Sequence, residues 1–193
     1  MATAHRLFAL SVGVAAMLAG PVPAPSAELQ DPLSPPASAK GSMLCFRRDY
    51  SPAHLAQHPK QTTRSVLLAF REGFVTIVLT PRIGARKVIG AGCGWAQGAG
   101  IDTSGHKMIP NFDKPAGFDC IVTVGNSAEE RGYLLIDPAQ DAKSLTLFLQ
   151  SSIAAYSGEQ EKAEDLELGP DDLTFKLTRI GPKACEEFKT KIE

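Results

Sequence analysis

The sequence predicts an all-β protein, a small antiparallel barrel or sandwich of seven to eight strands with short helical segments and two disulfides. The first observation is residues 64–82, RSVLLAFREGFVTIVLTPR, where two alternating apolar runs flank the break Arg71–Gly73. Alternation in β-branched and aromatic residues is typical of half-buried strands, and a short break with glycine predicts a hairpin. Because a hairpin is unstable alone, further strands must cover it. The side chains expected on its buried face are Val66, Leu68, Phe70, Val75, Ile77 and Leu79.

The second observation is a series of further short strand patterns with turn residues between them. These segments are 44–47, 86–97, 118–124, 133–136, 145–149 and 173–177. In 86–97, glycine at every second position leaves one face bare, which suits close approach of another backbone or a bulged strand. Many short strands separated by turns are typical of a sandwich or a small barrel.

Three other segments have helical or turn character. Residues 50–61 predict one or two helical turns, with Ser51 as the cap and a proline at the first helical position. Residues 184–192 predict a short closing helix, and the acidic segment 150–172 is expected to be helical in part. Within it, the Gly-Pro-Asp-Asp sequence that ends at Asp172 predicts a turn before the last strand, and such turns rarely bury a carboxylate.

The third observation is the set of four cysteines, Cys45, Cys93, Cys120 and Cys185. An even number in an exported chain favours two disulfides, and four cysteines allow three pairings. The absence of a C-x-x-C spacing argues against a zinc ribbon or a thioredoxin-type redox pair. We expect Cys93–Cys120, because both lie on apolar faces of predicted strands, and Cys45–Cys185, because these two bracket the folded part.

The N-terminal region predicts export. Residues 1–27 combine a positive charge at Arg6, an apolar run and a helix-breaking stretch, the pattern of a Sec-type signal peptide. The apolar run is too short to span a bilayer, so we expect cleavage and no membrane span afterwards. Residues 28–42 are rich in Pro, Ser and Ala and predict a disordered tether. Residues 43–193 then form a single β-rich domain of a periplasmic or extracellular protein.

Charge is distributed unevenly along the chain, although the net charge is only −1. Residues 45–90 hold eight basic and two acidic side chains, whereas residues 129–172 hold three basic and eleven acidic ones. One interpretation is a basic surface for an envelope protein or an anionic polymer. The simpler one is that the two halves partly neutralise each other across the barrel. Nucleic acid is not expected as a partner. The candidate ligand-binding residues are Arg64, Arg71, Arg82, Arg86 and Lys87.

Two histidines raise a metal hypothesis. His54 and His58 are four residues apart on the predicted helical turn, so both rings can face one way as half of a zinc or copper site. A third ligand would come from elsewhere, and His106 is the only other histidine after the signal peptide. The simpler interpretation is two surface imidazoles, and we expect no cofactor.

The predicted loop 98–117 raises a hydrolase hypothesis. Asp102, Ser104 and His106 bring a carboxylate, a hydroxyl and an imidazole into one short stretch. However, a nucleophile needs its base held by a rigid frame, and the sequence has no G-x-S-x-G elbow. Polar turn residues are also what a solvent loop ordinarily contains.

Two stretches carry a resemblance to a known group. HLAQHPKQ at 54–61 and DDLTFKLTRIGPKAC at 171–185 resemble elements of small exported bacterial β-rich proteins of unknown function. The resemblance covers most of the mature chain and implies no activity or site. The overall design is also similar to that of periplasmic lysozyme inhibitors, but their aromatic-rich signature is absent, so this similarity is architectural.

The sequence therefore predicts an exported, non-catalytic envelope or periplasmic binding protein. Its candidate surface comprises the 50–61 turn, the basic hairpin and the 98–117 loop. The alternatives are a small hydrolase that uses Asp102 and His106, and a metal-binding domain that uses His54 and His58.

Overall fold

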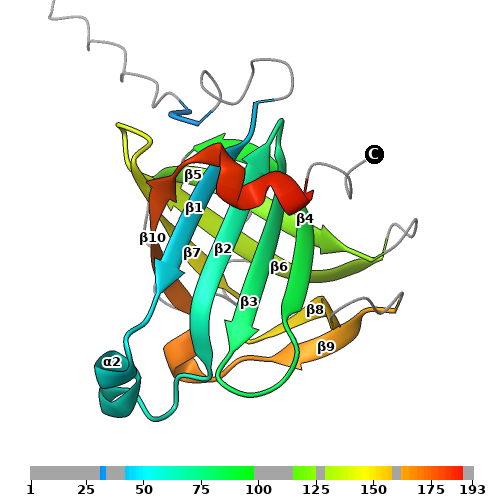
Figure 1. The fold of residues 1–193 in the computed structure, drawn as a ribbon. Helices are drawn as coiled ribbons and strands as arrows, with labels where there is room; N and C mark the ends of the chain where they lie inside the picture. The colour runs from blue at the N-terminus through cyan, green and yellow to red at the C-terminus, as the bar shows by residue number, and fades with distance from the viewer. Residues whose placement is uncertain (1–30, 34–41, 98–114, 125–128, 158–161, 189–193) are drawn as a thin grey trace, which may run out of the picture.

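Strands make up most of the computed structural model, which describes residues 31–33, 42–97, 115–124, 129–157 and 162–188 (Figure 1). The strands are β1 (Leu44–Asp49), β2 (Thr63–Arg71), β3 (Phe74–Pro81), β4 (Lys87–Gln97), β5 (Ala116–Thr123), β6 (Glu130–Pro138), β7 (Ser144–Leu149), β8 (Ser152–Ser157), β9 (Glu164–Glu167) and β10 (Thr174–Ile180). The helical elements are α2 (Pro52–Gln57), η2 (Pro170–Asp172) and η3 (Pro182–Phe188).

Eight of the strands close into an antiparallel barrel. Their order is β3-β2-β1-β10-β7-β6-β5-β4, and a β3–β4 pairing completes the circle. These are the eight strands predicted from the alternation, so the all-β class is confirmed. The β3–β4 pairing shows that the fold is a barrel and not a sandwich. Closure leaves these strands without free edges.

The hairpin at residues 64–82 has the predicted form. Val66 pairs with Leu79 and Phe70 with Val75, and all six side chains expected on its buried face lie in the core. The two-residue turn has positive φ at Glu72 (48°) and Gly73 (81°). Two such residues match the twist of the flanking strands, which explains the glycine after the first run.

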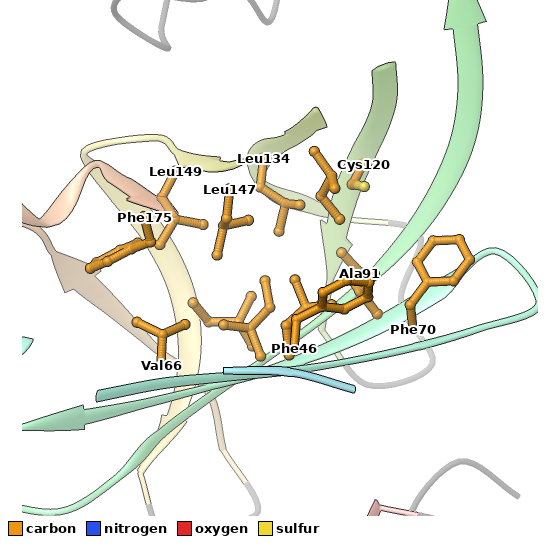
Figure 2. Close-up of a cluster of buried hydrophobic side chains, with 14 of the residues drawn as sticks. Phe46, Val66, Phe70, Ala91, Cys120, Leu134, Leu147, Leu149 and Phe175 are labelled. Carbon is orange, nitrogen blue, oxygen red and sulfur yellow. The ribbon is translucent and has the colours of Figure 1, made fainter. Parts of the chain in front are cut away.

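Apolar side chains from all around the barrel fill its interior. Phe46, Leu147 and Phe175 are fully buried there, as Figure 2 shows. An eight-stranded barrel is just wide enough for side chains to fill. Leu33, from the segment predicted as a tether, is also fully buried in this core cluster. The prediction for the rest of 28–42 concerns residues that are mostly outside the described part.

The segment 150–172 differs from its prediction. Instead of helix it contains the hairpin β8–β9, which extends the sheet beyond β4, and only the short turn η2 is helical. β8 packs so closely on β6 that a Cβ at Gly132 would lie 2.6 Å from Ile153 Cγ1. Burial of Ile153, Ala154 and Ala155 therefore holds this alanine-containing run as a strand.

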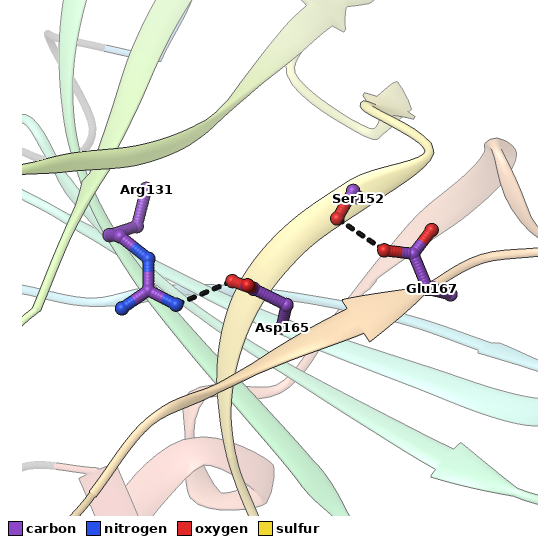
Figure 3. Close-up of polar contacts among 4 residues, drawn as sticks. All are labelled: Arg131, Ser152, Asp165 and Glu167. Carbon is purple, nitrogen blue, oxygen red and sulfur yellow. Dashed lines mark hydrogen bonds and ion pairs between the residues drawn. The ribbon is translucent and has the colours of Figure 1, made fainter.

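Polar contacts hold the β8–β9 hairpin at its exposed face (Figure 3). Arg131 on β6 pairs with Asp165 on β9 at 2.5 Å, and the Ser152 hydroxyl donates to Glu167 at 2.6 Å. The first of these is an ion pair made within the acidic segment 129–172. The charge of Asp165 is therefore neutralised within the acidic segment and not by the basic residues of 45–90.

Both predicted disulfides are present. Cys93 and Cys120 lie directly opposite each other on β4 and β5, and Cys45 on β1 is joined to Cys185 on η3. Their presence indicates folding in an oxidising, exported location. The predicted closing helix at 184–192 begins earlier, at Pro182, and its described part is the 3-10 helix η3.

η3 covers part of the outer wall of the barrel. A second apolar cluster joins Cys185 and Phe188 to side chains that point outward from β1, β2 and β3. Among the described residues, no helix combines the length and the apolar character needed to cross a bilayer. The predicted signal peptide lies outside the described residues and stays a prediction.

Candidate binding site

A hollow of about 590 Å³ lies on the outer wall of the barrel, over β1, β2 and β3. It is bounded by η3 at one end and α2 at the other, the two helical elements that Figure 1 shows near opposite ends of these strands. We call it the arginine hollow. Its lining residues are Arg47, Asp49, Tyr50, Pro52, Leu55, Arg64, Ser65, Leu67, Val78, Thr80, Arg82, Arg86, Ala184 and Glu187.

Strand alternation determines its floor. Because Val66 and Leu68 point into the barrel, Ser65 and Leu67 point outward. Across the sheet, Leu67 pairs with Arg47 on β1 and with Val78 on β3. Ser65 makes the next row with Asp49 and Thr80. The floor therefore has an apolar centre with polar groups beside it.

The α2 wall is held in place by local capping and by the barrel. The Ser51 hydroxyl accepts a hydrogen bond from His54 N at 3.2 Å, and Pro52 occupies the start of the helix, as predicted. Leu55 is the buried residue of the helix. Arg82 reaches across to the carbonyl oxygens of Leu55 and Gln61 at 3.5 and 3.4 Å. These contacts join α2 to the end of β3.

The entry to β2 is anchored by a buried carboxylate that the sequence analysis placed in a turn. Asp172 is fully buried. Its Oδ2 accepts from Thr62 N and Thr62 Oγ1, both at 2.7 Å, and its Oδ1 accepts from Thr63 N at 3.0 Å. The expectation that this turn would not bury its carboxylate is therefore wrong, because the groups that satisfy Asp172 are far away in the chain.

The four arginines of the hollow differ in how they are held. Arg47 makes a two-point contact with Asp49, at 2.8 and 2.9 Å, and Arg86 lies 3.7 Å from Glu187. Within the described ranges, Arg82 contacts main-chain carbonyls and no carboxylate. The exposed Arg64 side chain makes no ion pair or hydrogen bond with any residue in the described ranges. Among the described lining residues four cations face two carboxylates, so this part of the hollow carries a net positive charge.

The structure brings together three of the five predicted ligand-binding residues, namely Arg64, Arg82 and Arg86. Arg71 lies at the opposite, hairpin end of β2, and Lys87 contacts the Ser157 hydroxyl. Arg47 was missed as a site residue. The sequence could have identified it, because Arg47 lies two residues after Cys45 and therefore on the same outward face of β1.

Tyr50 forms the corner between the floor and α2. Its ring stacks on His54 with centroids 4.7 Å apart, and Arg48 lies 5.2 Å above the ring. Burial raises the pKa of the Tyr50 phenol above its ordinary value of 10.0, although the charge of Arg48 acts in the opposite direction. The phenol is therefore neutral at physiological pH and can donate a hydrogen bond.

The two histidines of α2 are stacked on each other. The rings of His54 and His58 have centroids 4.3 Å apart, and His54 Nε2 lies 3.0 Å from Gln61 Oε1. Parallel stacked rings direct their nitrogens side by side and not toward one shared point. Within the described ranges no three His, Cys, Asp or Glu residues are grouped to hold a metal ion. The metal hypothesis stays a prediction.

The hydrolase candidates Asp102, Ser104 and His106 lie outside the described residues, so the structure does not bear on them. A second hollow of about 580 Å³ covers the other end of β3 and β4, over the predicted bare glycine face. Its charged lining residues are Glu72 and Asp119, both acidic. The described lining of this second hollow therefore differs in charge from that of the arginine hollow.

Comparisons of the chain with protein-family models, with curated proteins and with solved structures found no match. The chemistry of the arginine hollow is therefore the basis for the functional proposal.

Proposed function

We propose that this chain is an exported, non-catalytic envelope or periplasmic binding protein, and that the arginine hollow takes an anionic group of its ligand. The observation that carries the proposal is Arg64. Arg64 lines the hollow, and its exposed side chain has no side-chain or main-chain acceptor among the described residues. The planar donor fork of arginine matches carboxylate and phosphate oxygens, which makes Arg64 the natural first contact for an anion.

Several features together support affinity. A single exposed ion pair contributes about 0–1 kcal/mol, so one arginine alone would not hold a ligand. Arg82 adds a second cation that no carboxylate in the described part neutralises, and Leu67 supplies apolar contact between the charges. A partly enclosed site with several cations also attracts anions from solution, which speeds association.

The lining supports binding more than catalysis. It contains the hydroxyls of Ser65 and Thr80, but no histidine or cysteine among its described residues. Asp49, the nearest candidate base, is already engaged by Arg47. A nucleophile without a positioned base is weak. The two disulfides support an exported location. The assignment to the periplasm rests on the predicted signal peptide.

A charge-reversal pair tests the proposal. Binding of fluorescently labelled poly-L-glutamate is measured by anisotropy at low salt for the oxidised protein, for Arg64→Glu and for Arg71→Glu. The two variants change the same charge on the same strand, but only Arg64 lines the hollow. We expect Arg64→Glu to weaken binding about tenfold and Arg71→Glu less than about twofold. Equal losses in both variants would show general charge attraction and overturn the proposal.

A further inference from the structure

The size of the arginine hollow indicates a ligand larger than a single small anion. Its floor spans two outward rows of residues, Arg47–Leu67–Val78 and Asp49–Ser65–Thr80. Residues two apart on a strand are about 6.5 Å apart, and three neighbouring strands span about 10 Å. With about 590 Å³ between η3 and α2, the hollow accommodates three to five residues of an extended peptide.

The apolar part of the floor is small and central. Val78 and Leu55 are mostly covered, and the half-buried Leu67 is the aliphatic side chain within reach of a ligand. That area suits one aliphatic side chain. It does not suit a lipid acyl chain, which needs a long apolar cavity, and the barrel interior is already occupied by side chains such as Phe46 and Phe175.

The cations surround this apolar centre instead of clustering at one point. Arg47 lies on the β1 side, Arg64 and Arg82 lie toward α2, and Arg86 lies on the β4 side. A carboxylate fits this setting, because Arg47 already holds the Asp49 carboxylate in a two-point contact. The matching ligand therefore presents several carboxylates around one aliphatic group.

We infer that the ligand is an acidic segment of a partner polypeptide, with an aliphatic side chain flanked by carboxylates that sits over Leu67. This inference rests on the proposed function and narrows it to one class of ligand. In an extended polypeptide the side chains on one face are about 6.5 Å apart, which matches the separation of the two rows of the floor, and a polypeptide can combine carboxylate and aliphatic side chains at that spacing.

Matched peptides test the inference. One labelled pentapeptide has four glutamates around a central leucine, and its match has serine at the centre. We expect the leucine peptide to bind the parent protein about fivefold more tightly, the effect of partly burying one aliphatic side chain. Leu67→Thr should remove this preference, and Phe74→Thr, which removes an exposed ring at the other end of β3, should leave it unchanged. Thermal unfolding checks that both variants are folded.

Other probes separate the inference from the proposed function. Equal affinity for the two peptides, or tighter binding of inorganic polyphosphate or of phosphatidylglycerol vesicles, would overturn the inference. If Arg64→Glu still weakens the binding of the preferred probe about tenfold in that case, the anion site stands and only the ligand class is wrong. If no probe distinguishes Arg64→Glu from Arg71→Glu, both proposals are wrong.

Discussion

Replacing Asp172 by asparagine tests the anchor that holds the entry of β2 beside the arginine hollow. The carboxylate accepts three hydrogen bonds, two from Thr62 and one from Thr63 N, and it is fully buried. An asparagine can place its oxygen where Oδ2 stands, which keeps both bonds from Thr62. Its NH₂ group then faces Thr63 N–H, so that two donors oppose each other and one buried N–H has no acceptor.

The expected cost follows from these contacts. An unsatisfied buried donor costs about 1–3 kcal/mol, and two charge-assisted bonds become weaker neutral ones, so the free energy of unfolding should fall by about 3 kcal/mol. For a domain of this size that corresponds to a decrease of about 6–12 °C in the melting temperature. Circular dichroism of the oxidised protein during heating measures it.

Asp171→Asn is the matched control, because this neighbouring carboxylate is less buried and makes none of the contacts to Thr62 and Thr63. We expect its melting temperature to stay within about 2 °C of the parent. If Asp172→Asn also stays within that range, the buried carboxylate is not the anchor and the reasoning fails.

Three further predictions concern the rest of the barrel. Gly132→Ala should lower the free energy of unfolding in urea by about 3 kcal/mol, because φ at this position is +130° and Ile153 leaves no room for a Cβ. Gly94→Ala is the control, since a Cβ there would meet open space, and it should cost less than about 1 kcal/mol. Ultraviolet titration should show a phenol that ionises above pH 10.0 and is missing in Tyr50→Phe. Because the raised pKa means that the folded state holds this proton more tightly, the contribution of Tyr50 to the free energy of unfolding is complete below pH 10.0 and is lost as pH rises through the folded-state pKa. Changing Cys45 and Cys185 together to alanine opens a loop of 140 residues and should lower the free energy of unfolding by about 5 kcal/mol. Opening the bridge between β4 and β5, with a separation of 27 residues, should lower it by about 3.5 kcal/mol. If urea unfolding gives the larger cost for the shorter loop, the chain-entropy argument is wrong.

The candidate site was predictable only in part. Arg64, Arg82 and Arg86 could be chosen from the sequence because they belong to one basic run around a hairpin. Arg71 belongs to the same run, yet it lies at the far end of β2, since seven residues of strand span about 23 Å. A count of charges along the sequence does not show which end of β2 lies beside the arginine hollow.

Other features depended on partners distant in the chain. The burial of Asp172 arises from Thr62 and Thr63, 110 and 109 residues away. β8 was not recognised as a strand because its run is short and includes alanine, which has good helix propensity. It becomes a strand where β4 offers an unpaired stretch of backbone next to β5.

The sequence by itself determined the all-β class, the eight barrel strands, the inward faces of the hairpin and the presence of two disulfides, with the observed pairing favoured among three possible ones. These follow from a period of two and from an even number of cysteines, which are local or countable properties. Only the tertiary structure decided that the strands close into a barrel, because the same alternation serves a sandwich equally well. It also decided that η3 and α2 lie on the outer wall with the arginine hollow between them, because η3 is held there by the Cys45–Cys185 disulfide and α2 by Arg82, and both contacts join residues that are distant in the chain.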